Sequence, residues 1–456
     1  MYNSSMDITL DAALRADSST QIAFTGAGGK SIAMFQLARF LGKAQRGTRV
    51  ILTATSHLGA WQTDSADRHI IAGSLSALEV LNQGTKGVIL VTGELDGDRT
   101  RPLEDPSLDW LHAYCQRHHV PLLVEADGSR QKPLKGWAKH EPPVPSFAEH
   151  VVQVAGLGGL GKPLINEYVH RAEIFSRLGE IGMGELMTAE VLTRVLSHRD
   201  GGLKNIPPGA RRSLILNQAD TPELQAAAQS MAGSLLGHFH AVVISSLLQE
   251  NIFAVHERTA GIILAAGEST RFGQAKQLLD WRGQPFVRTV ARTALDAGLS
   301  PVIVVTGASA EKVESVLGDL DTIIVRNTDW ESGQGSSIRE GIKRLLQPDS
   351  SPWTGAVIFL LADQPQVTTS VIRALVEKHA EGLHPIVAPM VIDQRANPVL
   401  FDRVTFPDLM NLEGDVGGRA IFHLHRVEYL PWQDDRLLLD VDTPEMYLRL
   451  IADETL

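Results

Sequence analysis

Short runs of apolar residues alternate along this chain with longer stretches in which apolar positions recur at helical spacing. This alternation is typical of α/β proteins, whose strands are covered by amphipathic helices. The apolar runs predict strands at residues 21–24, 49–53, 87–91, 121–125, 151–154, 212–216, 242–245, 261–264, 301–305, 322–325, 356–361 and 386–389. The helical spacing predicts helices at residues 31–42, 287–297, 310–317 and 369–379.

Some predicted strands, such as residues 357–361, are apolar at nearly every position. Strands that are buried on both faces have this composition, and they occur mainly in parallel sheets. The sequence therefore predicts an α/β protein with mostly parallel sheets.

A polar segment separates two halves of the chain. Residues 249–251 are polar, residues 256–258 are charged, and a new apolar run opens at Ala260. We therefore expect an N-terminal domain at residues 1–255 and a C-terminal domain at residues 256–456, each long enough for its own core.

The composition excludes several classes of protein. A net charge of -11 argues against nucleic acid as a partner, because protein surfaces that bind nucleic acid are usually basic. The single cysteine, Cys115, cannot form a disulfide within the chain, and this fits a cytoplasmic location. No run of about 18 apolar residues occurs, so we expect no membrane span.

A candidate phosphate loop follows the first strand of the second half. After Leu264 the strand runs into small residues that let the backbone approach a ligand: Ala265, Ala266 and Gly267. Arg271 and Lys276 then bring two positive charges to the same loop. These groups are suited to a nucleoside triphosphate, and they would stabilise charge on a leaving pyrophosphate. We therefore expect Arg271, Lys276 and the downstream Asp363 to be catalytic.

Two carboxylates follow apolar runs in the second half. Asp363 follows the apolar run of residues 357–361, and ligands collect at the carboxyl ends of strands in open α/β sheets. A carboxylate there can hold Mg²⁺, which prefers oxygen ligands and substrate phosphates. Asp442 follows residues 437–439 and either faces the same metal or caps the helix expected near Pro444.

The stretch Leu264-Ala-Ala-Gly-x-Ser-x-Arg-x-Gly-x-x-Lys-x-Leu-Leu resembles the signature of molybdenum cofactor cytidylyltransferases, within the wider family of sugar-nucleotide-type nucleotidyltransferases. The resemblance covers nearly all of residues 260–448. Further segments match in order: Gly333-Gln-Gly-Ser-Ser-Ile338, Leu361-Ala-Asp-Gln-Pro365, Asn397-Pro-Val-Leu-Phe401, Gly414-Asp-Val-Gly-Gly-Arg419 and Asp440-Val-Asp-Thr-Pro444.

The resemblance implies a Rossmann-like, GT-A-like domain that transfers CMP from CTP to molybdenum-bound molybdopterin with Mg²⁺. The Ala-Ala-Gly form of the loop favours CTP over GTP. Ser336, Ser337 and Asn397 are then expected to contact the pterin acceptor, although either serine could instead cap a helix. Ala396 departs from the family pattern, which often has glycine there. The alternatives are another nucleotide or acceptor, or a module that delivers the cofactor to a molybdenum hydroxylase apoenzyme.

A second glycine-rich loop opens the first half, between a predicted strand and a predicted helix. Phe24 stands where a full P-loop has glycine, but the shorter form Thr25-Gly-x-x-Gly-Lys-Ser resembles the phosphate loop of Mur-type ligases. We expect ATP or GTP at this P-loop-like domain, held by Gly26, Gly28, Gly29, Lys30 and Ser31.

The first half also contains the motifs Thr53-Ala-Thr-Ser-His57, Glu125-Ala-Asp-Gly-Ser-Arg130, Pro133-Leu-Lys135 and His140-Glu-Pro. These motifs resemble those of the YqeC family, which is associated with selenium-dependent molybdenum hydroxylases. Asp127 is our candidate for a metal ligand, with Glu125 as its competitor.

Two further patterns are weaker. Asn217-Gln-Ala-Asp220 is similar to the Asn-Lys-x-Asp motif with which GTPases bind guanine, but Gln218 replaces the lysine. Residues 156–161 match the dinucleotide fingerprint, yet Pro163 follows at once, so we expect no NAD or FAD there. His57, His140 and His170 lack the spacing of a zinc site.

Overall fold

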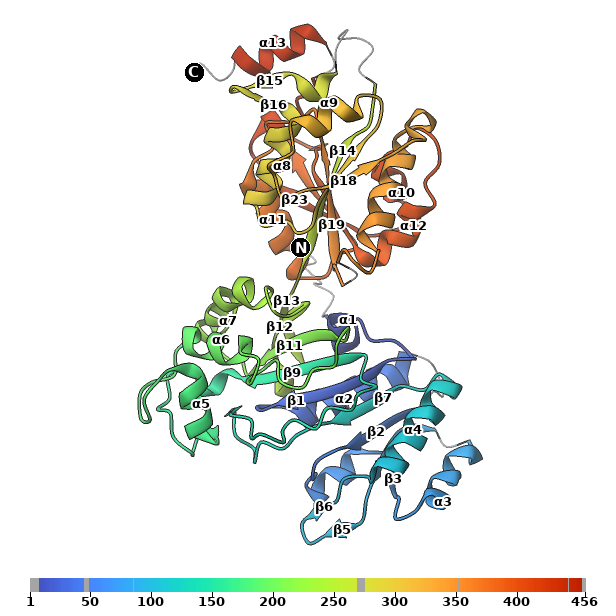
Figure 1. The fold of residues 1–456 in the computed structure, drawn as a ribbon, viewed down its shortest axis with the longest axis vertical. Coiled ribbons are helices and arrows are strands. Elements are labelled where there is room, and N and C mark those ends of the chain that lie inside the picture. The colour runs from blue at the N-terminus through green and yellow to red at the C-terminus, as the bar shows by residue number, and fades with distance from the viewer. Residues whose placement is uncertain are drawn as a thin grey trace. The chain divides into compact units, whose positions relative to one another are not determined.

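The computed structural model describes residues 8–44, 49–84, 86–268, 275–351, 353–441 and 443–452. The chain forms two compact units, Met1–His256 and Glu257–Leu456, here called the N-terminal and C-terminal units (Figure 1). Every strand and helix predicted from the sequence is present, with ends within two residues of the prediction.

The N-terminal unit is built on a nine-stranded sheet. Neighbouring strands from β12 to β3 pair in parallel, as the apolar runs predict. The strand order is β13 (Asn251–Glu257), β12 (Ala241–Ser246), β11 (Arg211–Asn217), β9 (His150–Gly156), β1 (Gln21–Gly26), β7 (Leu122–Glu125), β2 (Arg49–Ala54), β4 (Gly87–Thr92) and β3 (Arg68–Ile71).

Helices cover this sheet because each has an apolar side. In α4, Leu108, Leu111 and Cys115 are buried against Ile51 and Leu122 of the sheet. The helices of the unit are α1 (Leu10–Leu14), α2 (Lys30–Ala44), α3 (Leu75–Leu78), α4 (Asp105–His118), α5 (Ala172–Gly179), α6 (Ala189–Ser197) and α7 (Pro222–Leu235).

The buried position of Cys115 predicts an unreactive thiol. Burial raises the pKa of Cys115 to about 12, and the nearby Arg49 only partly opposes this shift. Since the thiolate is the reactive form, the folded protein should not react with dithiobis(nitrobenzoate) at pH 8. After unfolding in guanidinium, the single cysteine should release one equivalent of thionitrobenzoate. Rapid reaction of the folded protein would contradict this placement.

The C-terminal unit is built on an eight-stranded mixed sheet. Its strand order is β18 (Ile323–Arg326), β17 (Val302–Thr306), β14 (Thr259–Ala265), β19 (Ala356–Leu361), β22 (Val399–Asp402), β20 (Ile386–Val391) and β21 (Gln394–Arg395), with β23 (Val427–Pro431) paired to β20. The four strands from β18 to β19 are parallel, whereas β22 is antiparallel to both of its neighbours. The sheet is therefore mostly, but not wholly, parallel.

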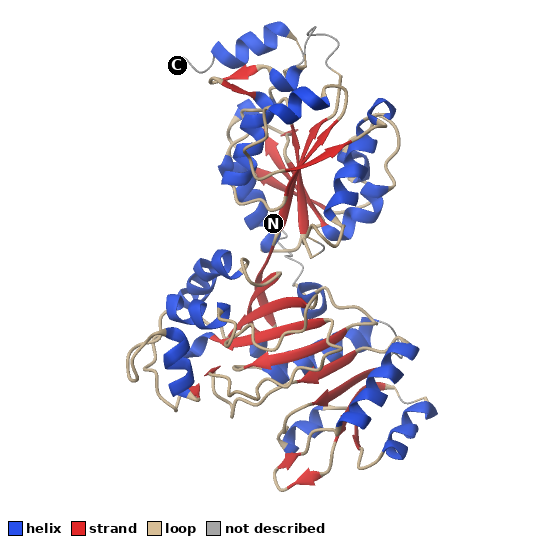
Figure 2. Cartoon of the chain, in the orientation of Figure 1, coloured by secondary structure: helices blue, strands red, loops and turns tan. Residues whose placement is uncertain are grey.

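Helices lie on both faces of this second sheet (Figure 2). Successive residues of β14 point to opposite faces, so Ile263 packs with α8 and α11 while Ile262 packs with α10 and α12. The helices are α8 (Phe286–Asp296), α9 (Ala310–Ser315), α10 (Gln334–Leu345), α11 (Thr369–Ala380), α12 (Phe406–Met410) and α13 (Pro444–Ala452).

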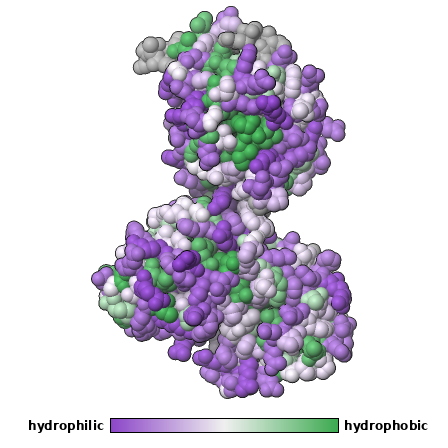
Figure 3. All heavy atoms as spheres, viewed as in Figure 1, coloured by the Kyte–Doolittle hydropathy of each residue, from purple (hydrophilic) through white to green (hydrophobic). Residues whose placement is uncertain are grey.

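The visible surface is mainly polar, with apolar side chains gathered at a few places on each unit (Figure 3). Within the described ranges, no helix has the length and apolar character needed to cross a membrane.

Candidate functional site

A cleft of about 590 Å³ lies at the carboxyl ends of β14 and β19 in the C-terminal unit. The end of β14, the loop after β19 and the start of α10 all contribute to its lining. The lining includes Leu264, Ala266, Gly267, Lys276, Ser337 and Asp363. Residues from separate predicted motifs therefore meet at one site.

Lys276 and Asp363 face each other in this cleft. The Lys276 Nζ lies 4.0 Å from Oδ2 of Asp363, and about a third of the Asp363 side chain is exposed. Asp363 is placed by the end of β19, which is hydrogen-bonded beside β14. Arg271 and Asp442, the other charged residues expected here, lie outside the described residues.

The loop after β14 is held by contacts that the sequence does not reveal. Gln277 is buried, and its Nε2 donates to the carbonyl oxygens of Gly267 at 2.8 Å and Ala265 at 3.3 Å. The carbonyl of Ala266 accepts from the Ala308 amide at 3.1 Å. These bonds fix the small residues at the mouth of the cleft. Gln277 carries no pattern that could have singled it out.

Ser336 and Ser337 are buried in the first turn of α10. Both hydroxyls accept from Nδ2 of Asn327, at 2.7 and 3.0 Å, and Ser336 also donates to the Gly333 carbonyl. Ser337 lines the cleft. Of the two serines, only Ser337 is among the residues that line the cleft, while Ser336 supports the first turn of α10.

Gly333 permits a close approach between two motifs of the second half. Its φ is +108°, and a side-chain Cβ there would lie 2.4 Å from the Asp415 amide nitrogen. The Gln334 amide donates to Oδ1 of Asp415 at 3.3 Å. This contact brings Asp415 to the lining of the cleft.

Asn397 occupies a separate cluster of the C-terminal unit. Its Oδ1 accepts from Nη2 of Arg419 at 3.5 Å, and the same nitrogen donates to the Arg395 carbonyl. The Arg395 guanidinium lies 5.7 Å from the ring centre of Phe422 and 5.8 Å from that of Tyr429. The described lining of the 590 Å³ cleft does not include Asn397.

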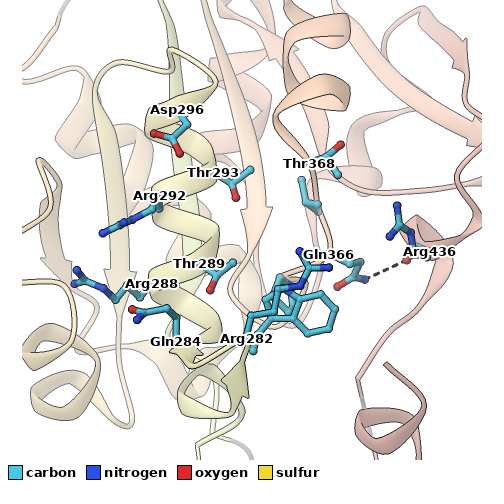
Figure 4. Close-up of a pocket in the computed structure, with 13 residues that line it drawn as sticks. Arg282, Gln284, Arg288, Thr289, Arg292, Thr293, Asp296, Gln366, Thr368 and Arg436 are labelled. Carbon is cyan, nitrogen blue, oxygen red and sulfur yellow. Dashed lines mark hydrogen bonds between the residues drawn. The ribbon is translucent and has the colours of Figure 1, made fainter. Parts of the chain in front are cut away.

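A second cavity, of about 420 Å³, lies beside α8 and is rich in arginine (Figure 4). Three of its arginines have nearby partners. Arg288 and Arg436 form ion pairs with Asp319 and Asp434, and Arg282 lies over the ring of Trp281. Its positive charge is therefore partly neutralised within the unit.

The glycine-rich loop of the N-terminal unit joins β1 to α2. Gly26, Gly28 and Gly29 all have positive φ, at +96°, +79° and +131°. Lys30 is buried, and its Nζ donates to the Gly26 carbonyl at 2.7 Å. A Cβ on Gly28 would lie 2.5 Å from the Gly156 Cα, so close packing explains glycine at both positions. The dinucleotide-like segment thus packs against this loop.

Two carboxylates reach the loop from the end of β7, which lies beside β1. Glu125 Oε2 accepts from the Ser31 hydroxyl at 2.6 Å, and Oε1 lies 4.0 Å from Lys30 Nζ. Burial raises the pKa of Glu125, and the Lys30 charge opposes that shift. Gln62 donates to the same Ser31 hydroxyl. Glu125 therefore lies where a metal beside Ser31 would need a carboxylate.

Asp127 is engaged differently. Its oxygens accept from the Gly26 amide at 3.0 Å, Lys135 Nζ at 2.8 Å and Trp137 Nε1 at 3.1 Å. The Lys135 ammonium also lies 3.2 Å from Glu141. Asp127 thus ties the glycine loop to a buried ionic cluster.

The histidines singled out in the sequence do not gather. Nδ1 of His57 lies 3.0 Å from the Thr100 carbonyl oxygen. Burial, helped by Arg171, lowers the pKa of His170 to about 4, so this ring is neutral at pH 7. Within the described ranges, no three histidine, cysteine or acidic side chains are grouped as metal ligands would be.

The C-terminal unit is a mixed α/β domain of the nucleotidyltransferase class. Residues 261–430 match the MobA-like NTP transferase domain, and residues 22–173 match the YqeC protein family. The chain belongs to the MobA-like NTP transferase family and carries a YqeC-like domain ahead of the transferase domain.

Three curated relatives match parts of the chain. Nicotine blue oxidoreductase of Paenarthrobacter nicotinovorans is 31% identical over 42% of this chain and 95% of its own length. Purine catabolism protein PucB of Bacillus subtilis (strain 168) is 29% identical over 41% of this chain and 93% of its own length. The uncharacterized protein YqeC of Escherichia coli (strain K12) is 29% identical over 44% of this chain and 76% of its own length.

Proposed function

We propose that the C-terminal unit transfers CMP from CTP to the phosphate of molybdenum-bound molybdopterin and releases pyrophosphate. The observation that carries this proposal is the meeting of Lys276, Asp363 and the Ala266–Gly267 segment in one cleft. The resemblance of the motifs to molybdenum cofactor cytidylyltransferases supplies the choice of acceptor and nucleotide.

In this reaction, an oxygen of the acceptor phosphate attacks the α-phosphorus of CTP. The bond from that phosphorus to its bridging oxygen breaks, and pyrophosphate leaves with the bridging oxygen. Lys276 binds the phosphates and stabilises the negative charge that grows on the leaving group. Ser337, and Asn397 from its separate cluster, orient the acceptor.

The acidic lining of the cleft suits a divalent cation. Glu268, Glu331, Asp363 and Asp415 line it beside Lys276. A bare triphosphate would be repelled by these carboxylates, so the nucleotide would bind with Mg²⁺. Asp363 would hold this ion, with Asp442 as a second candidate, and the bound ion would neutralise phosphate charge.

The choice of nucleotide can be tested by competition. With Mg²⁺ and a molybdopterin acceptor, the protein should consume CTP faster than GTP from an equal mixture, because its loop has the Ala-Ala-Gly form. Nucleotide consumption and pyrophosphate release are measured together. Equal or faster use of GTP would contradict the cytidylyl assignment.

Other activities are separable in the same assay. Turnover with a different phosphorylated acceptor would indicate another nucleotidyltransferase. Binding without pyrophosphate release would indicate a module that delivers the cofactor to a hydroxylase apoenzyme. One relative is named an oxidoreductase, so NAD(P)H oxidation is monitored as a control for hydride transfer.

For the N-terminal unit we propose an accessory nucleotide site at Gly26, Gly28, Gly29, Lys30 and Ser31. The buried Lys30, the positive-φ glycines and the start of α2 support the binding of a triphosphate. Glu125 is the carboxylate better placed to act with Ser31 at a Mg²⁺ ion, because Asp127 already binds the loop amide and Lys135.

A further inference from the structure

The motif at residues 217–220 lies on the same edge of the N-terminal sheet as the glycine loop. It begins at the carboxyl end of β11, and Ser245, Ser246 and Leu247 lie at the end of β12. The strand order β12-β11-β9-β1 is parallel throughout, so all these strand ends meet at one edge. Ligands bind at this edge in open α/β sheets.

Asn217 joins these segments directly. Its Nδ2 donates to the Gly28 carbonyl at 2.7 Å, and its Oδ1 accepts from the Leu247 amide at 2.9 Å. A Cβ on Gly29 would lie only 2.3 Å from the same Nδ2. The buried side-chain amide of Asn217 therefore links the glycine loop to the end of β12.

Asp220 projects from the loop that Asn217 anchors. The Ser246 hydroxyl donates to its Oδ1 at 2.5 Å, and the residue is exposed. Oδ2 has no hydrogen-bond partner among the residues that the structure describes. Gln218, at the position of the motif's lysine, is held by the Gly158 amide at 3.2 Å. The bond from Ser246 thus orients the Asp220 carboxylate, and its Oδ2 can still accept hydrogen bonds from a ligand.

We propose that the N-terminal unit is a guanine-nucleotide site in which Asp220 recognises the base. A carboxylate can accept from both the N1–H and the 2-amino group of guanine, which lie side by side. Adenine has an acceptor at N1 and no amino group at C2, so it cannot donate this pair of hydrogen bonds to Asp220. This inference rests on the proposed binding of a triphosphate at Lys30 and Ser31, and it adds that the base of this nucleotide is guanine.

Competition on the full chain tests this proposal. Fluorescent methylanthraniloyl-GTP is titrated with Mg²⁺ and excess CTP, and it is then displaced by GTP, ATP or XTP. The signal that Lys30→Ala removes is assigned to the N-terminal unit. GTP should displace this signal at least about 10-fold more effectively than ATP, the scale of one hydrogen bond to a charged group.

The variant Asp220→Asn should shift the base preference from guanine towards xanthine. Its amide oxygen still accepts from N1–H, but its amide N–H now matches the carbonyl at C2 of xanthine. GTP binding should fall about 10- to 100-fold while XTP binding rises. A gain of XTP affinity also shows that the variant is folded. Glu223→Gln is the matched control, because Glu223 is an exposed carboxylate outside the motif, and this variant should bind like the parent.

Two results would overturn the inference, and they differ in whether the proposed nucleotide site fails as well. If ATP and GTP bind equally and Asp220→Asn changes neither, the base is not read by Asp220, although the nucleotide site stands. If no nucleotide gives a Lys30-dependent signal, both the guanine assignment and the proposed nucleotide site fail. Neither result bears on CMP transfer by the C-terminal unit.

Discussion

Replacement of Lys276 by alanine is expected to lower kcat/KM for CMP transfer by about 10²- to 10³-fold, the usual effect of removing one fixed transition-state donor. Its ammonium lies beside Asp363 in the cleft, where it would meet the phosphates of the nucleotide. Pyrophosphate release under subsaturating CTP measures the loss.

Lys343→Ala is the control for this prediction. Lys343 is an exposed lysine near the end of α10 that pairs with Glu340. Its replacement should leave turnover within about twofold of the parent, as expected for an exposed pair of little energetic weight. Retention of full activity by Lys276→Ala would place the transfer chemistry elsewhere.

Replacement of Lys135 by methionine is expected to lower the free energy of unfolding of the N-terminal unit by about 3–5 kcal/mol, because it leaves buried charges without their partner. The Lys135 side chain is fully buried, and its ammonium contacts Asp127, Glu141 and the Gly128 carbonyl. Burial acts to raise the pKa of Glu141, but hydrogen bonds from Arg171 and Lys135 and their positive charges hold this pKa below its ordinary value.

Urea unfolding followed by circular dichroism measures this change, and hydrogen exchange read by mass spectrometry assigns it to residues of the N-terminal unit. Lys139→Met provides the matched control, since Lys139 is exposed and only four positions away. A loss below about 1 kcal/mol for Lys135→Met, no larger than the loss expected at an exposed site, would show that the cluster is not stabilised as described.

The strands were predictable because burial on both faces leaves nearly continuous apolar runs, as in β19. The reversed direction of β22 was not predictable in this way. Residues 399–401 are as apolar as a parallel strand, and only pairing with β19 and β20 reveals their direction. Strand existence is a local property of the sequence, whereas strand direction depends on distant partners.

The residues of the candidate site could be recognised in the sequence, but the residues that hold them in place could not. Lys276 and Asp363 stand in recognisable motifs, and the fold brings them together. Gln277 and Asn327 act through hydrogen bonds to backbone and side chains elsewhere, so no local pattern marks them. The roles proposed for Arg271 and Asp442 stay predictions.

The two carboxylates at the carboxyl end of β7 illustrate the same limit. Glu125 and Asp127 are two residues apart, and sequence spacing alone left the choice of metal ligand open. The contacts differ because Glu125 reaches Ser31, while Asp127 turns to the Gly26 amide and Lys135. This difference depends on Lys135 and Trp137, which both donate to Asp127 from a segment further along the chain.

Transfer of CMP to a molybdopterin acceptor would change the mass of that acceptor, so mass spectrometry of the product tests the proposed reaction. The full chain is incubated with CTP, Mg²⁺ and molybdenum-bound molybdopterin, and the acceptor is analysed by mass spectrometry while pyrophosphate is quantified. We predict that the acceptor gains one CMP for each pyrophosphate released, and that Lys276→Ala suppresses both. An acceptor of unchanged mass, with CTP left intact, would show that the protein does not catalyse this transfer.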